Sequence, residues 1–167
     1  YAKGLGYYNN VNYEEAMKIW QAILVFDANH KGANEYLEKT KAIVNQREAL
    51  KHVENAKNNI IKNKILKAME ELRLAISCDP NNEAVRKSVS LLKRDLLMEH
   101  NKKAVELFRQ NKTIDAISEW NIVLAVDPEN FSAKKGIEEA DNILNKLKQE
   151  EKQNLEYESI VKKAEQS

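Results

Sequence analysis

The sequence contains little that interrupts a helix, with only 4 glycines and 2 prolines in 167 residues. Glycine and proline are the strongest punctuators of local structure, so this shortage favours helix almost throughout the chain. The strict alternation of apolar and polar residues that is typical of strands is also missing. We therefore expect an all-α protein.

Other shortages narrow the class of protein further. A single cysteine, Cys78, excludes an internal disulfide framework but leaves the compartment open. The net charge is +1 with 32% charged residues, which lacks the basic excess of a nucleic-acid module. No apolar run approaches the ~18 residues of a membrane span. The chain begins with Tyr1 and ends inside a helical pattern, so we expect a fragment whose leader or anchor would be missing.

What the sequence does contain is one segment in three versions. They read AMKIWQAILVFDANH at 16–30, AMEELRLAISCDPNN at 68–82 and AISEWNIVLAVDPEN at 116–130. Asp27, Asp79 and Asp127 end the apolar part of each copy and stand 52 and 48 residues apart. A segment that recurs at such a period is the signature of a repeat array.

Each copy carries the same landmarks on one helical face. The positions are Ala16, Trp20 and Ile23; Ala68, Leu72 and Ala75; and Ala116, Trp120 and Val123. Spacings of four and three put each set on one face of a helix. A second small residue stands upstream at Gly4, Ala56 and Ala104, followed by apolar residues and a short polar turn. The pattern predicts two helices joined by a tight turn and crossing at small residues.

This pattern resembles the tetratricopeptide repeat (TPR) family. The residues that carry the likeness are Gly4, Tyr8, Ala16, Trp20, Ala68, Leu72, Pro80, Ala104, Phe108, Ala116, Trp120 and Pro128. Three features depart from the family. The period is about 50 residues instead of about 34, Ala28 stands where proline is usual, and the equivalent residues His52 and His100 replace an aromatic.

The resemblance implies a helical repeat array, or α-solenoid, of alternating long and short helices that forms one domain over residues 1–167. Its units would be about 1–30, 31–81, 82–129 and a truncated fourth at 130–167. The extra residues predict long helices over 33–62, 82–111 and 131–166, capped by Asn29, Asn82 and Asn130. The alternative is that each long helix kinks, near 98–103 in the second.

We find no constellation that carries chemistry. His30, His52 and His100 lie in three different units, with no cysteine or carboxylate at a metal-ligand spacing, and are interpreted as surface or inter-helix residues. Cys78 is level with Phe26 and Val126 in the repeat, so we expect a buried apolar residue and not a reactive thiol. We therefore predict no catalytic residue, no metal and no cofactor, and hence no enzyme in this chain.

The TPR resemblance also implies where a partner would bind, because the first helix of each unit lines a groove in that family. The matching positions are Leu5, Asn9, Val53, Lys57, Ile61, Asn101, Val105 and Arg109. One subtype of the family clamps a chaperone's C-terminal carboxylate with lysine and asparagine. Tyr1 stands where that clamp needs lysine, which argues against chaperone-tail binding.

These observations predict a non-enzymatic scaffold that binds other proteins, as repeat arrays do, with no nucleic acid and no membrane insertion. The long helices favour a brace in a multi-protein complex, and the alternative is a groove-type peptide-binding or co-chaperone-like adaptor. Abundant lysine, asparagine and isoleucine with scarce arginine suggest an AT-rich bacterial genome. Our specific hypothesis is a periplasmic cell-envelope machine such as a flagellar-motor collar, with a cytoplasmic location as the alternative.

Overall fold

The computed structural model describes residues 1–165, and this range folds into seven α-helices. They are α1 (Ala2–Asn9), α2 (Tyr13–Phe26), α3 (Lys31–Ile61), α4 (Ile65–Cys78), α5 (Glu83–Arg109), α6 (Thr113–Val126) and α7 (Phe131–Glu165). The all-α prediction is confirmed. The chain forms two compact units, Tyr1–Leu91 (unit 1) and Leu92 onward (unit 2), and α5 begins in the first and ends in the second.

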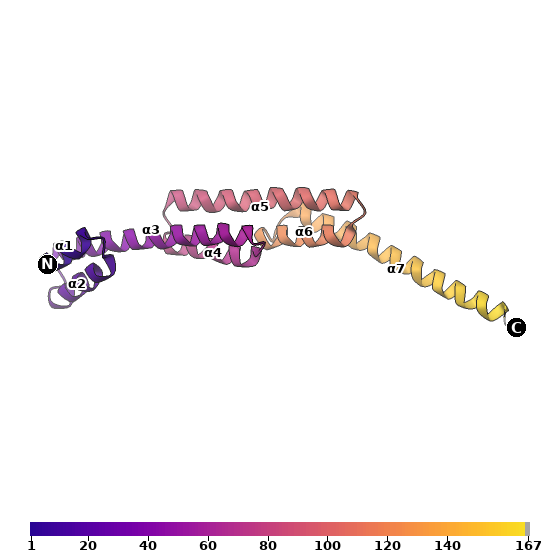
Figure 1. Ribbon diagram of the computed structural model, residues 1–167, viewed down its shortest axis with the longest axis horizontal. Coiled ribbons are helices and arrows are strands. Elements are labelled where there is room, and N and C mark those ends of the chain that lie inside the picture. Colours follow the sequence, from indigo (N-terminus) through magenta and orange to yellow (C-terminus); the bar gives the residue numbers. More distant parts are fainter. Residues whose placement is uncertain (166–167) are drawn as a thin grey trace. The chain divides into compact units, whose positions relative to one another are not determined.

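In unit 1, the long helix α3 packs against both α2 and α4. The short helix α2 packs on its first half, α1 packs on α2 and contacts α3 through the rings of Tyr8 and Tyr36, and α4 runs along its second half (Figure 1). The core around α2 consists of Ala16, Trp20, Ala33 and Leu37. Further along, Ala49, Val53 and Ala56 of α3 are buried, as are Ala68, Leu72 and Ala75 of α4. The small residues predicted at the helix crossings, Gly4 and Ala56 among them, are therefore in the interior.

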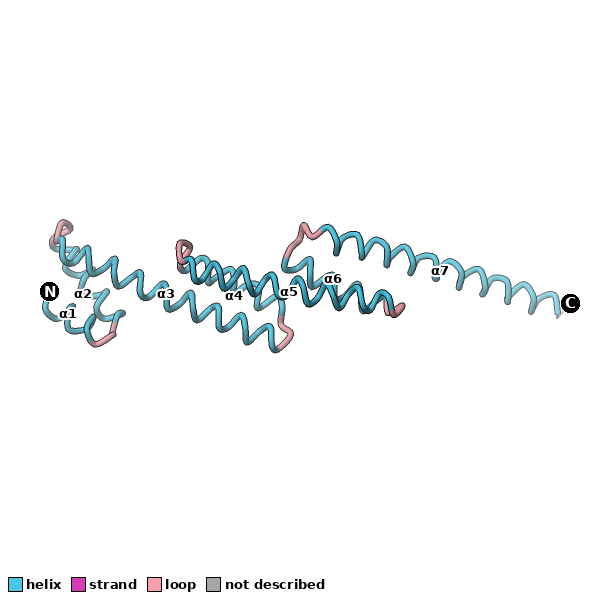
Figure 2. Tube along the Cα trace, turned by 90° about the horizontal axis from the view of Figure 1, so that it is seen from above, coloured by secondary structure: helices cyan, strands magenta, loops and turns pink. Residues whose placement is uncertain are grey.

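In unit 2, α6 packs between the end of α5 and the first half of α7 (Figures 1 and 2). The core cluster is Ala104, Ala116, Trp120, Val123, Ala133 and Ala140. The small residue of α5 and the three repeat positions of α6, namely Ala104, Ala116, Trp120 and Val123, are thus all buried. The second half of α7 extends away from this core, and its residues 151–160 are exposed.

The same turn follows α1, α3 and α5. Its central residues are Val11, Asn63 and Asn111, with φ angles of 64°, 53° and 60°. The next residue in each turn donates its backbone N–H to a carbonyl five positions earlier: Asn12 to Tyr7 at 2.9 Å, Lys64 to Asn59 at 2.8 Å and Lys112 to Leu107 at 2.9 Å. A left-handed residue followed by this hydrogen bond is a standard way to end a helix.

The starts of the long helices confirm two of three predicted caps and correct the third. Asn82 Oδ1 accepts the Val85 N–H and Asn130 Oδ1 accepts the Ala133 N–H, each at 3.1 Å. Asn29 does not cap its helix. His30 does, because its Nδ1 accepts the Ala33 N–H at 3.1 Å and so takes the place three residues after the aspartate that asparagine holds in the other copies.

The long helices lie close to their predicted positions. The predicted spans 33–62, 82–111 and 131–166 correspond to Lys31–Ile61, Glu83–Arg109 and Phe131–Glu165. Residues 98–103 are helical within α5. Residues 166–167, which the predicted fourth unit at 130–167 includes, lie outside the described residues.

Candidate interaction surfaces

Two polar clusters join helices at equivalent positions of the sequence repeat. On α3 and α4, His52 Nδ1 lies 2.7 Å from Glu71 Oε2, which also accepts a hydrogen bond from Asn55 Nδ2 at 3.2 Å. On α5 and α6, His100 Nδ1 lies 2.6 Å from Glu119 Oε2, and Lys103 Nζ lies 2.6 Å from Glu119 Oε1. These histidines are therefore inter-helix residues, in agreement with one of the two interpretations of the sequence.

The two glutamates are held in their charged form. The hydrogen bond to His52 lowers the pKa of Glu71. Burial alone would raise the pKa of Glu119, but hydrogen bonds to His100 and Lys103 outweigh it, and the pKa is lowered. Hydrogen bonding to a carboxylate favours its charged form, so both clusters tie folding to an ionised glutamate.

Unit 1 surrounds the Trp20 indole with tyrosine rings. The Tyr1 ring centroid lies 5.3 Å from that of Trp20, and the Tyr36 ring stacks on the same indole at 5.3 Å. Gly4 of α1 lies so close that a Cβ there would stand 2.6 Å from the indole. The indole therefore fills the space that a side chain at Gly4 would need, and two tyrosines cover it.

Unit 2 places Trp120 at the equivalent position but surrounds it differently. A Cβ on Gly136 of α7 would stand 2.5 Å from the indole, and the Phe108 centroid lies 5.5 Å away. Gly136 is equivalent to Tyr36, and Ala104 is equivalent to Gly4. The glycine that contacts the tryptophan thus lies on the preceding helix in unit 1 and on the following helix in unit 2.

A cavity of about 420 Å³ lies beside Trp120 in unit 2. Its lining comes from three helices: Asn101, Val105, Phe108 and Arg109 of α5, Trp120 of α6, and Phe131, Ser132, Lys135, Gly136 and Glu139 of α7. Two polar atoms of this lining, Asn101 Oδ1 and Trp120 Nε1, are buried without a hydrogen-bond partner in the described part of the chain. The volume falls in the range of small-molecule and side-chain pockets.

The structure separates the eight predicted groove residues into three groups. Asn101, Val105 and Arg109 come together on the cavity beside Trp120. Asn9, Lys57 and Ile61 are exposed, and the Lys57 ammonium lies 3.3 Å from the Glu54 carboxylate.

The other two predicted groove residues belong to the core. Leu5 is half-buried and packs on the cluster around Trp20, while Val53 is only 4% exposed. Val53 is therefore not available to a ligand. Its spacing from Ala49 and Ala56 places it on the buried stripe of α3, so the groove position that the TPR resemblance implies for Val53 is wrong.

Five cavity residues lie on α7 and were not predicted: Phe131, Ser132, Lys135, Gly136 and Glu139. The resemblance implies binding residues only on the first helix of each predicted repeat, and these five lie on the long helix that follows α6. A signal for the cavity was nevertheless present in the sequence, because glycine at 136 aligns with tyrosine at 36.

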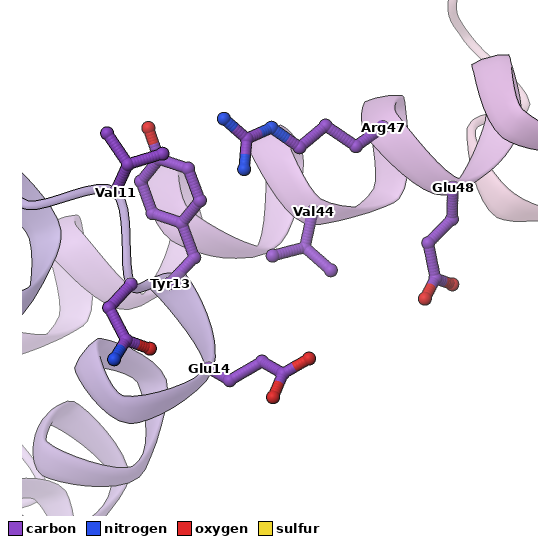
Figure 3. Close-up of a pocket in the computed structure, with 7 residues that line it drawn as sticks. Val11, Tyr13, Glu14, Val44, Arg47 and Glu48 are labelled. Carbon is purple, nitrogen blue, oxygen red and sulfur yellow. The ribbon is translucent and has the colours of Figure 1, made fainter.

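A shallow notch lies between the turn after α1 and the long helix α3. Val11, Tyr13, Val44 and Arg47 line it together with Asn12, Glu14 and Glu48, around a volume of about 270 Å³. The Arg47 guanidinium lies over the Tyr13 ring, 4.6 Å from its centroid (Figure 3). An equivalent notch in unit 2 has Thr113, Leu144 and Leu147 in these places. The contact between the Arg47 guanidinium and the Tyr13 ring is a cation–π interaction, which stabilises the packing of α2 on α3 at the first notch.

Exposed apolar side chains lie next to one another near the ends of α2 and α7. Val25 and Phe26 end α2, and Phe26 is 92% exposed. Near the end of α7, Tyr157, Ile160, Val161 and Ala164 follow one another at helical spacing, and all but the half-buried Val161 are exposed. We call these four residues the α7 stripe. Spacings of three, one and three put them on one face of the helix.

The remaining candidates carry no visible site. Cys78 is half-buried, not fully buried as predicted, and burial together with the nearby Glu48 charge raises the pKa of its thiol. Within residues 1–165, no three histidine, cysteine or acidic residues are grouped to hold a metal. None of the described helices is both long and apolar enough to cross a membrane.

Comparison with known proteins found no matching family model and no matching curated protein.

Proposed function

We propose that this protein is a non-enzymatic scaffold that binds other proteins and braces a larger assembly. The observation that carries this proposal is the pair of exposed apolar surfaces, Val25 with Phe26 on α2 and the α7 stripe. Contiguous apolar side chains left in solvent mark protein–protein contact sites more often than chance. Their position at the ends of helices fits an element that is contacted at its ends and sides.

The proposed architecture is an α-solenoid of TPR type with long repeats. Three observations support it. The left-handed turn recurs at Val11, Asn63 and Asn111, the histidine–glutamate contact recurs 48 residues apart, and each tryptophan packs on a glycine. In a repeat array each unit contacts mainly its neighbours and offers an extended surface to partners.

The proposed setting is a bacterial cell-envelope complex, with the periplasmic collar of a flagellar motor as our specific hypothesis. Support for it comes from composition, since lysine, asparagine and isoleucine are abundant and arginine is scarce, and from the long helices. A cytoplasmic location is the alternative.

A groove-type peptide adaptor is the second candidate function. The observation in its favour is the cavity beside Trp120, on which three predicted groove residues meet. Adaptor and brace differ in which surface is occupied, so one experiment separates them.

The experiment is site-specific photo-crosslinking in the source cell. A photoreactive phenylalanine analogue replaces Phe26, Tyr157 or Arg109 in turn, with the exposed Lys67 as the control position. Crosslinks from Phe26 and Tyr157 to several members of one envelope assembly support the brace, whereas crosslinks from Arg109 alone to one protein support the adaptor. Equal products from Lys67 and the other positions would contradict both.

A further inference from the structure

The two tryptophans stand at equivalent positions and both are buried, but their surroundings differ, and a cavity lies beside Trp120. In unit 1, Tyr1 and Tyr36 cover Trp20, with ring centroids 5.3 Å from the indole in both cases. The residues equivalent to these tyrosines in unit 2 are Asn101 and Gly136. Two aromatic rings are thus replaced by an amide and a hydrogen atom, and a cavity of about 420 Å³ lies beside the buried Trp120 indole.

The chemistry of the filled site in unit 1 indicates what fits the open site in unit 2. The Tyr1 ring contacts Trp20, Tyr36 and His30, with centroids 5.3, 6.2 and 5.4 Å away. The open site keeps aromatic walls in Trp120, Phe108 and Phe131. Aromatic pairs in offset or edge-to-face arrangements attract beyond the area they bury, so these walls favour an aromatic ring as occupant.

The charges around the cavity indicate which residues should flank the bound aromatic ring in a partner. Lys135 and Glu139 face each other at 3.7 Å and offset one another's charge. Arg109 is exposed and forms no ion pair with any described residue. A guanidinium without a partner beside an aromatic pocket favours a carboxylate next to the bound ring, because arginine binds carboxylates through two parallel hydrogen bonds.

Polar atoms in the lining distinguish tyrosine from phenylalanine. Asn101 Oδ1 is buried and accepts no hydrogen bond within the described residues. A buried acceptor left unpaired is costly, and the hydroxyl of a tyrosine is a donor of suitable length at the end of the ring. Phenylalanine has no hydroxyl and would leave Asn101 Oδ1 without a hydrogen bond.

We propose that the cavity beside Trp120 binds a tyrosine side chain of a partner peptide that carries acidic residues next to the tyrosine. The proposal rests on the proposed protein-binding function and assigns a partner chemistry to one surface of it. In this arrangement the partner supplies in trans the ring that Tyr1 supplies within unit 1. Asn101 and Gly136, which stand in place of the two tyrosines of unit 1, line this cavity, and Arg109 selects the charge of the peptide.

The test is a titration followed by the two indole N–H signals in an NMR spectrum of the ¹⁵N-labelled protein. The probe is a pentapeptide with blocked ends, a central tyrosine and four aspartates. The Trp120 signal should shift and saturate while the Trp20 signal, in the filled site, stays in place. Peptides with central alanine, or with lysines replacing the aspartates, should bind at least tenfold more weakly.

Two variants distinguish the contribution of the cavity to binding from the contribution of the Arg109 charge. Asn101→Tyr introduces the ring found at the equivalent Tyr1 and should weaken binding at least tenfold, with circular dichroism to verify folding. Arg109→Glu changes only an exposed residue and should reverse the preference, so that the lysine-flanked tyrosine peptide binds better. Lys152→Glu, an exposed change on the far part of α7, is the matched control and should leave binding unaltered.

Several outcomes would overturn the proposal. They are an equal shift of both indole signals, equal binding of the alanine peptide, or an Arg109→Glu variant that keeps the original preference. Crosslinks from Phe26 and Tyr157 to an assembly would still support the brace in each of these cases, so the two proposals fail separately.

Discussion

At the scale of single residues, the two tryptophans show how a glycine decides where a large side chain lies. Trp20 fills the space over Gly4 and Trp120 fills the space over Gly136, in both cases at a distance that a Cβ could not tolerate. The equivalent residues, Ala104 and Tyr36, carry side chains. In each unit, therefore, the glycine that contacts the tryptophan lies on only one of the two flanking helices.

Gly136→Ala should destabilise unit 2 by about 1–2 kcal/mol. The new methyl group would meet the buried indole at 2.5 Å, and overpacking of this kind costs about 1–3 kcal/mol. The better helix propensity of alanine offsets up to about 1 kcal/mol of that cost. Urea denaturation followed by circular dichroism measures the difference.

Gly6→Ala is the matched control, because a Cβ at Gly6 meets nothing within 4 Å. This change should stabilise the protein by roughly 0.5–1 kcal/mol through helix propensity alone. A Gly136→Ala variant as stable as Gly6→Ala would mean that the Trp120 indole does not lie on α7.

Val11→Asn should stabilise unit 1 by about 1 kcal/mol. Val11 has φ 64°, a left-handed conformation that is costly for a β-branched residue and cheaper for asparagine. The chain itself supplies the comparison, since Asn63 and Asn111 hold the same turn position. The gain should appear as a higher midpoint of urea denaturation with an unchanged slope.

The reciprocal change, Asn111→Val, should lower the stability of unit 2 by a similar amount. If both substitutions prove neutral, the turn does not require the left-handed conformation in solution.

At the scale of helix pairs, the histidine–glutamate clusters fix the register of a short helix on a long one. Both clusters use the same three places, a histidine, a residue three positions later and a glutamate on the next helix. The cluster in unit 2 is the more buried, with side chains 9% and 12% exposed, against 25% and 24% in unit 1. Its loss should therefore cost more.

Glu119→Gln should reduce stability at neutral pH by about 1–3 kcal/mol, the range for a lost hydrogen bond to a buried charged group. It should also change the acid limb of the pH profile. The pKa of Glu119 is lowered in the folded protein, so its contribution is present above the unfolded pKa, near 4.5, and is lost as the pH falls through the folded pKa. The wild-type protein should lose stability in that window more steeply than Glu119→Gln.

Thermal unfolding at a series of pH values between neutrality and strong acid measures this slope. Glu129→Gln is the control, because Glu129 pairs with Lys134 in an exposed position, with 87% of its side chain accessible, and exposed pairs contribute little. Parallel acid limbs for wild type and Glu119→Gln would show that the cluster does not couple folding to ionisation.

At the scale of the whole molecule, the sequence predicted the helices better than the surfaces. Helix bounds follow from local signals, namely the apolar period, the aspartate at each break and the asparagine caps. The missed cap at His30 has a local cause too, since imidazole is not among the usual capping side chains. The burial of Val53 follows from its spacing to Ala49 and Ala56, and periodicity is here a better guide than the resemblance to a family.

The cavity beside Trp120 could not be predicted in the same way. It depends on α5, α6 and α7 converging around one indole, and a volume is a property of several helices at once. The sequence contains only the substitution pattern, Asn101 for Tyr1 and Gly136 for Tyr36, which becomes a cavity once the helices are in place.

The α7 stripe allows a test of the brace that does not touch the core. Tyr157→Lys combined with Ile160→Lys should change the free energy of unfolding by less than about 0.5 kcal/mol, because both side chains are exposed, by 70% and 64%. The same variant should lose the crosslinks that form from the neighbouring Ala164 position in the cell, since two charges cannot be buried in an apolar contact without a large cost.

The control replaces Lys148 and Lys152, on the exposed part of α7, by glutamate. It changes the charge at two positions, as the stripe variant does, and leaves the four residues of the α7 stripe unchanged. It should keep those crosslinks, which ties any loss in the first variant to the apolar face itself. If the stripe variant instead unfolds at lower urea concentration, Tyr157 and Ile160 stabilise the fold of the chain. The apolar surface would then be part of the protein's own packing, and Val25 with Phe26 would remain as the only contact surface of the proposed brace.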